Sequence, residues 1–143
     1  MASKAKTLID VRVGLTQLFE SAGMSPDQPH IIIGGCAMFA QDLRETFEDV
    51  DVIIPGIART VEVWNGIPFD MDGILREQGG DDLGFEMMFE YSLKRHGLCF
   101  MRPEHIRRVK RKSGRKKDKA DLLVLTKHIE SQPMANPFFR DDP

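Results

Sequence analysis

The feature that most constrains this chain is a pair of glycines followed, 14 residues later, by two acids spaced two apart. Gly34-Gly35 follows an apolar run, and Asp49-Val50-Asp51 stands at the head of another. Because side chains two apart on a strand point to the same face, both carboxylates should lie on one side, with Cα atoms roughly 6.6 Å apart. Mg²⁺ favours a few carboxylate oxygens together with waters and substrate phosphates. The spacing therefore predicts a divalent-metal site beside a bound triphosphate.

The residues around these motifs predict the order strand, turn, helix, strand. Residues 30–33 are apolar enough for a short buried strand, Gly34-Gly35 predicts a tight turn, and residues 37–43 supply the inward face of a helix. Glycines before a helix N-terminus let backbone N–H groups approach phosphate oxygens, and the helix dipole favours negative charge there. A plain packing turn is the alternative, and acids that lead a strand often only hydrogen-bond a loop backbone.

Two groups of residues, far apart in the chain, follow one family pattern in the family's order. The first group is Ile33-Gly34-Gly35-Cys36-Ala37, Arg44-x-Thr46 and Asp49-Val50-Asp51-Val52; the second is Pro103-Glu104-His105-Ile106, Lys110, Arg115, Lys117-Asp118 and Asp121-Leu122. They resemble the DNA polymerase beta-like nucleotidyltransferases, particularly the short branch related to abortive-infection toxins and their minimal relatives. The resemblance covers about residues 30–56 and 97–126. It implies transfer of a nucleoside monophosphate from a nucleoside triphosphate (NTP) such as ATP to an acceptor hydroxyl on RNA, protein or a small molecule.

The same resemblance implies a role for each matched position. Asp49 and Asp51 would be catalytic and would bind Mg²⁺ or Mn²⁺. The nucleotide contacts would come from Gly34, Gly35, Arg44, Thr46, Lys110 and Lys117. The mobile ammonium of lysine can meet triphosphate oxygens, and Asp118 and Asp121 are expected to orient these basic residues. This chain departs from the pattern at Cys36, where many relatives carry a serine, and in the gap from Thr46 to Asp49, which is one residue longer than the commonest form.

Residues 60–71 predict a β-hairpin that supplies a third acid. Residues 60–64 and 67–71 alternate around Asn65-Gly66, a strong signal for a two-residue turn. The family usually takes a third carboxylate from the next strand, which completes the metal site and helps to deprotonate the attacking group. Asp70 is the candidate for this catalytic and metal-binding role, with Asp72 second and Glu62 as a further alternative. The competing interpretation makes these acids solvated residues of a half-exposed strand.

Charge is distributed unevenly along the chain. The formal net charge is −2, yet residues 107–119 hold nine lysines and arginines and one acid, which leaves the remainder at −10. A basic block of this kind attracts RNA, DNA or a triphosphate by raising the local concentration of anions. The alternative is that these basic residues form a solvated surface that binds no specific ligand.

Composition and length set the remaining expectations. The 143 residues suit one nucleotidyltransferase-like domain over 1–132 and an irregular tail over 133–143. The fold class expected is α/β (α+β), with helices packed on a small mixed sheet of about four or five strands. Residues 85–96 fit a helix ended by Gly97, with a strand over 86–90 as the alternative, and a terminal helix is expected to pack through Leu122, Leu123, Leu125 and Ile129. Two distant cysteines, Cys36 and Cys99, and the absence of a signal peptide or membrane span indicate free thiols and a cytoplasmic protein.

Two further functions remain open beside nucleotidyl transfer. In the first of these, the chain has the nucleotidyltransferase fold but is catalytically inactive, and it binds nucleic acid or a protein partner through residues 107–119. In the second, the chain is an interaction module of a toxin–antitoxin or phage–host system. The sequence leaves open the NTP used, the acceptor and the oligomeric state.

Overall fold

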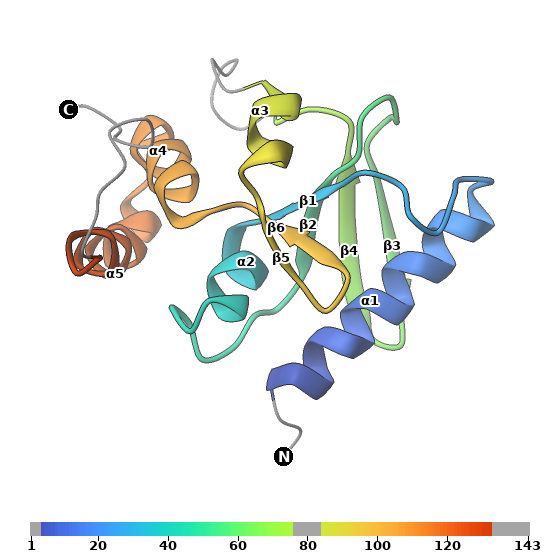
Figure 1. Ribbon diagram of the computed structural model, residues 1–143, viewed down its shortest axis with the longest axis horizontal. Coiled ribbons are helices and arrows are strands. Elements are labelled where there is room, and N and C mark those ends of the chain that lie inside the picture. The colour runs from blue at the N-terminus through green and yellow to red at the C-terminus, as the bar shows by residue number, and fades with distance from the viewer. Residues whose placement is uncertain (1–3, 76–83, 133–143) are drawn as a thin grey trace.

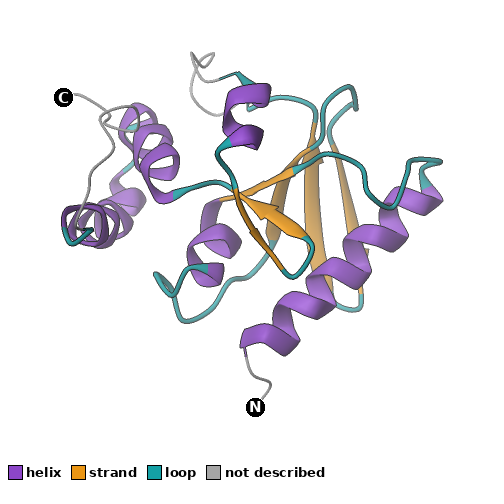
Figure 2. Ribbon diagram, in the orientation of Figure 1, coloured by secondary structure: helices purple, strands orange, loops and turns teal. Residues whose placement is uncertain are grey.

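The computed structural model describes residues 4–75 and 84–132. Within these ranges the chain is a mixed α+β structure with five α-helices, one short 3₁₀ helix and a six-stranded sheet (Figures 1 and 2). The helices are α1 (Lys4–Ser21), α2 (Gly34–Ala40), α3 (Phe85–Glu90), α4 (Pro103–Ser113), η1 (Lys116–Asp118) and α5 (Lys119–Glu130). The strands are β1 (Ile31–Ile33), β2 (Val50–Ile53), β3 (Thr60–Trp64), β4 (Ile67–Asp72), β5 (Leu93–Arg95) and β6 (Leu98–Phe100). No helix of the described ranges is long and apolar enough to cross a membrane.

The sheet mixes parallel and antiparallel pairs in the order β3-β4-β2-β1-β6-β5. β1 is antiparallel to β2 and parallel to β6, whereas β4 is antiparallel to β3 and parallel to β2. The chain therefore leaves β2, forms the edge strand β3, and returns as β4 between the two. This return brings residues of β4 directly beside residues of β2.

The hydrophobic core lies where α1 and α2 pack on the sheet. Along α1 the residues at helical spacing are buried: Leu8, Val11, Leu15 and Phe19. Gly14 allows this helix to approach the hairpin, because a Cβ there would overlap the Trp64 ring. Trp64 Nε1 also donates to Gln17 Oε1 at 2.7 Å. In Figure 1, α1 lies toward the β3–β4 end of the sheet, and α4 and α5 lie at the opposite side of the molecule.

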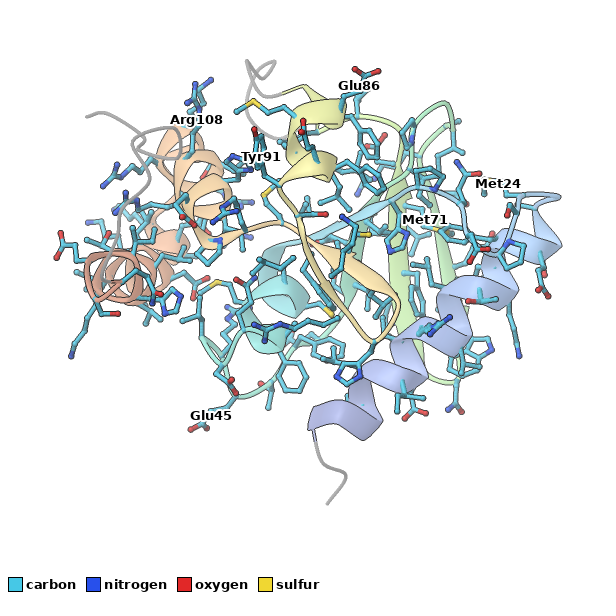
Figure 3. The ribbon with its side chains drawn as sticks, in the orientation of Figure 1. Met24, Glu45, Met71, Glu86, Tyr91 and Arg108 are labelled. Atoms are coloured by element: carbon cyan, nitrogen blue, oxygen red, sulfur yellow. The ribbon has the colours of Figure 1, made fainter. Side chains whose placement is uncertain are left out.

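The predicted hairpin is confirmed, with its turn at the predicted residues. Asn65 and Gly66 have φ values of 49° and 78°, as a primed two-residue turn requires. The alternation also assigns the faces of β4, since Phe69 and Met71 are buried while their neighbours are partly exposed. Figure 3 shows Met71 within the body of the molecule.

Two sequence predictions about the scaffold are wrong. The sheet has six strands rather than four or five, because residues 93–95, predicted as the end of a helix over 85–96, form strand β5. The helix ends at Glu90, and His96-Gly97 forms a tight turn with φ values of 54° and 77° that returns the chain into β6. In α5, Leu123 was expected to pack but is 74% exposed. The predicted tail over 133–143 lies outside the described residues.

We expect Phe69→Ala to lower the free energy of unfolding by about 3–5 kcal/mol, because it empties a fully buried aromatic site. Val63→Ala, on the exposed face of the neighbouring strand, is the matched control and should change stability by less than about 0.5 kcal/mol. Urea unfolding followed by circular dichroism measures both changes. Equal losses in the two variants would contradict the assigned faces of the hairpin.

Candidate functional site

A cavity of about 590 Å³ lies between the sheet and the α4–α5 pair. This volume falls within the range of about 300–1,000 Å³ that is usual for sites of small ligands. The motifs of both sequence groups line it, although residues 51 and 110 are far apart in the chain. The charged and glycine residues of the lining are Gly34, Gly35, Arg44, Glu45, Glu48, Asp49, Asp51, Asp70, Lys110, Arg115, Lys117, Asp118 and Asp121. Glu45 points outward from the loop after α2 (Figure 3).

The parallel pairing of β2 with β4 sets two carboxylates side by side on one wall. Asp51 and Asp70 are register partners, on strands that lie about 4.8 Å apart in such sheets. Asp49, which directly precedes β2, lines the same cavity. Gly34 has a positive φ of 67°, and a Cβ at this position would come within 3.2 Å of Asp51 Oδ2. A glycine is therefore suited to this position both by its backbone conformation and by the closeness of the carboxylate.

Of the acids proposed for the third position, the structure places only Asp70 in the main cavity. Asp72 is the register partner of Ile53 and lines a neighbouring cavity of about 70 Å³ instead. Glu62 lies on the exposed edge strand, where Thr60 Oγ1 is 3.4 Å from its Oε1. The geometry thus favours the first of the three candidates.

Arg59, which the sequence interpretation missed, binds Asp70 through both carboxylate oxygens. Its Nε donates to Oδ1 at 3.1 Å and its Nη2 donates to Oδ2 at 2.8 Å. A signal for this pair was present in the sequence, because a two-residue turn at Asn65-Gly66 fixes the hairpin register. That register puts residue 59 opposite residue 72 and diagonal to residue 70, within reach of a long side chain.

The opposite wall is a network of paired charges from α4, η1 and α5. Lys110 Nζ lies 3.2 Å from Asp118 Oδ1 and 3.1 Å from Asp121 Oδ2, and all three side chains are almost fully buried. Asp118 Oδ2 also accepts hydrogen bonds from Ser113 Oγ at 2.8 Å and Arg115 Nε at 3.0 Å. Because an ammonium has three donors, Lys110 can serve both carboxylates and still meet a further acceptor in the cavity.

Arg44 connects this network to the paired glycines. Its Nη2 lies 3.4 Å from Asp121 Oδ2, and its Nη1 lies so close to Gly35 that a Cβ there would overlap it. Thr46, two residues after Arg44, also lines the cavity. Lys117 lines it from η1. The residues that the two sequence motifs assign to nucleotide binding are therefore brought together around one cavity.

The acidity of Asp118 reflects this network. Burial disfavours the charged carboxylate, but the hydrogen bonds from Ser113 and Lys110, the charge of Lys110 and the hydrogen bond from Arg115 outweigh burial and lower the pKa of Asp118. The group is therefore ionised at neutral pH and holds Lys110 in a fixed position.

Cys36 does not line the cavity, although it directly follows the paired glycines. Its side chain is buried in the core, and burial together with the charges of Asp51 and Asp49 raises the pKa of the thiol to about 12. At neutral pH it is therefore a neutral, buried thiol.

The charges of the cavity fit divalent cations. Seven acidic and four basic residues line it among the described residues, and the acids remain in excess without the outward-pointing Glu45, so a triphosphate would enter a negatively charged site unless cations accompanied it. Carboxylate oxygens from Asp49, Asp51 and Asp70 are the donors that Mg²⁺ prefers. As the side chains stand, no three histidine, cysteine or acidic residues of the described ranges form a ready-made metal-binding group. Binding would require these carboxylates to turn toward one another.

Comparisons with protein-family models, with curated proteins and with solved structures find no match to this chain.

We expect Asp118→Asn to lower the free energy of unfolding by about 1–3 kcal/mol at pH 7, the usual contribution of hydrogen bonds to a charged group. The lowered pKa means that this stabilisation is complete above the unfolded value of about 3.9 and is lost as the pH falls through the folded value. The difference between variant and wild type should therefore shrink between pH 5 and about pH 2. Urea unfolding across this range measures it, with Asp27→Asn on an exposed loop as control; a difference independent of pH would contradict the assignment.

Proposed function

We propose that this chain has a nucleotidyltransferase-like fold and transfers a nucleoside monophosphate from an NTP to an acceptor hydroxyl, with Mg²⁺ or Mn²⁺. The observation that carries this proposal is the convergence on one cavity of Asp49, Asp51 and Asp70 with the glycine pair. The strand register supports it independently of sequence resemblance, because Asp51 and Asp70 are direct neighbours on β2 and β4. A buried basic network on the facing wall completes the arrangement.

In this proposal the acids would hold the metal and the basic wall would hold the triphosphate. Divalent metal, when bound, supplies charge that stabilises the phosphoryl oxygens and the leaving pyrophosphate. Gly35 leaves room for the Arg44 guanidinium to lie against the backbone, where its remaining donors would meet phosphate oxygens, and Gly34 leaves room for the Asp51 carboxylate. Lys110, fixed by Asp118 and Asp121, offers its remaining donor to the same phosphates. Apolar lining residues, including Ile106 and Val109, offer a surface to the base.

The reaction would join the acceptor oxygen to the α-phosphorus and break the bond between that phosphorus and the oxygen of the β-phosphate. Pyrophosphate leaves, and Asp70 accepts the proton of the acceptor hydroxyl before passing it to water. The acceleration comes chiefly from alignment and from charge placed where the transition state needs it.

We expect Asp51→Asn to lower transfer at least about 100-fold while the fold persists, because it removes a carboxylate that would hold the divalent cation and so weakens the positive charge at the reacting phosphate. The measurement is incubation of the purified chain with each labelled NTP, Mn²⁺ or Mg²⁺, and total cellular RNA or protein, followed by electrophoresis. Asp27→Asn, the same chemical change on an exposed loop, should transfer like wild type. Equal labelling by Asp51→Asn and wild type would overturn the assignment.

The second candidate function is nucleic-acid or protein binding without catalysis. The Arg59–Asp70 pair favours it, since a guanidinium already occupies the third acid, and the basic side chains Arg111, Lys112, Lys116 and Lys119 are exposed around the α4–α5 turn. In that case NTP and Mg²⁺ would not raise the melting temperature, and RNA binding would weaken steeply with salt. An interaction role in a toxin–antitoxin or phage–host system remains a third proposal, and the absence of any growth effect on expression would argue against a toxin.

A further inference from the structure

We propose that Arg59 is a latch on the metal site, which must release Asp70 before that carboxylate can bind a divalent cation. This inference rests on the proposed function, because it takes Asp70 to be a metal ligand. It concerns a residue that matches neither sequence motif. It also explains why the three carboxylates line one cavity without forming a ready-made metal-binding group.

The contact itself has the geometry of a latch. The guanidinium of Arg59 donates one hydrogen bond to each carboxylate oxygen of Asp70, at 3.1 and 2.8 Å. These two bonds fix the plane of the carboxylate. The Arg59 side chain is 59% exposed, whereas that of Asp70 is only 24% exposed. The guanidinium is therefore the more solvent-accessible partner and can move into solvent, while the acid stays in the wall of the cavity.

The guanidinium reaches Asp70 from outside the main cavity. Arg59 lines the smaller cavity of about 70 Å³, which shares Asp51 and Asp70 with the larger one. A cation that approaches Asp70 from the main cavity meets a carboxylate already turned toward Arg59. The positive charges of metal and guanidinium also repel each other at this short range. Both effects weaken metal binding as long as the latch is closed.

The segment that carries Arg59 is anchored against the end of β4. Ile54 N donates to Asp72 O at 2.8 Å, and the backbone of Ile57 lies so close to Gly73 that a Cβ on this glycine would overlap it. Arg59 directly precedes β3, so its Cα is fixed by the hairpin as well. Arg59 can therefore release Asp70 by a change of its side-chain rotamer, and the backbone can remain in place.

We expect Arg59→Gln to bind Mn²⁺ about two- to fivefold more tightly than wild type, the range that corresponds to loss of a partly exposed ion pair. Titration of the full chain with Mn²⁺, with free ion followed by electron paramagnetic resonance, measures this without any need for activity. Arg12→Gln removes the same charge from an exposed position on α1 and should leave the affinity unchanged. Arg59→Lys, which keeps the charge but loses the fork, should lie between wild type and Arg59→Gln.

Nuclear magnetic resonance of the wild-type chain offers a second test, with Asp51→Asn as its control. The Arg59 Nε–H resonance should shift as Mg²⁺ is added, and this shift should be lost in Asp51→Asn. Unchanged or weaker Mn²⁺ binding by Arg59→Gln would overturn the latch, and weaker binding would show that Arg59 positions Asp70 for the metal. If wild type binds Mn²⁺ in an Asp51-dependent manner while Arg59→Gln matches it, only the latch is wrong. If wild type binds no Mn²⁺, the proposed function falls with it.

Discussion

The parallel pairing of β2 with β4 is the constraint on which the rest of the site depends. It places Asp51 directly beside Asp70, although like charges at neighbouring positions of a sheet oppose folding. The fork of Arg59 on Asp70 offsets part of this repulsion. On the facing wall, Lys110 is in turn balanced by Asp118 and Asp121. The chain thus carries two opposed charged walls, each with internal partners, around one cavity.

The sequence predicted local elements correctly where it contains residues that favour one type of turn. Asn65-Gly66 fixed the hairpin and its register, because both residues readily adopt a positive φ. Strand β5 was missed because residues 85–93 also match a helical spacing, and a three-residue strand gives too short an alternation to compete. The His96-Gly97 turn was the available signal. The parallel neighbours of β2 and of β1 are set by packing of distant segments, which no local pattern records.

The sequence likewise predicted some residues of the candidate site and missed others. Asp49, Asp51 and the glycine pair could be named from spacing, and the hairpin register could select Asp70 over Glu62. The pairing of Lys110 with Asp118 and Asp121 needed the fold of α4 against α5, since a turn at residues 114–115 and the 3₁₀ helix η1 separate α4 from α5. Arg59 was missed because it lies in a loop, where charged residues are usually solvated. Cys36 directly follows the paired glycines in sequence, yet its side chain is buried in the core.

The most direct test of this account is an anomalous-scattering map from crystals grown with Mn²⁺ and a non-hydrolysable NTP. We expect a Mn²⁺ peak about 2.1 Å from carboxylate oxygens of Asp51 and of Asp49 or Asp70, the distance usual for a small divalent cation. The triphosphate should lie between that peak and Lys110, with Arg59 turned away from Asp70. A triphosphate bound elsewhere, or a cavity without Mn²⁺ in which Arg59 still holds Asp70, would contradict it.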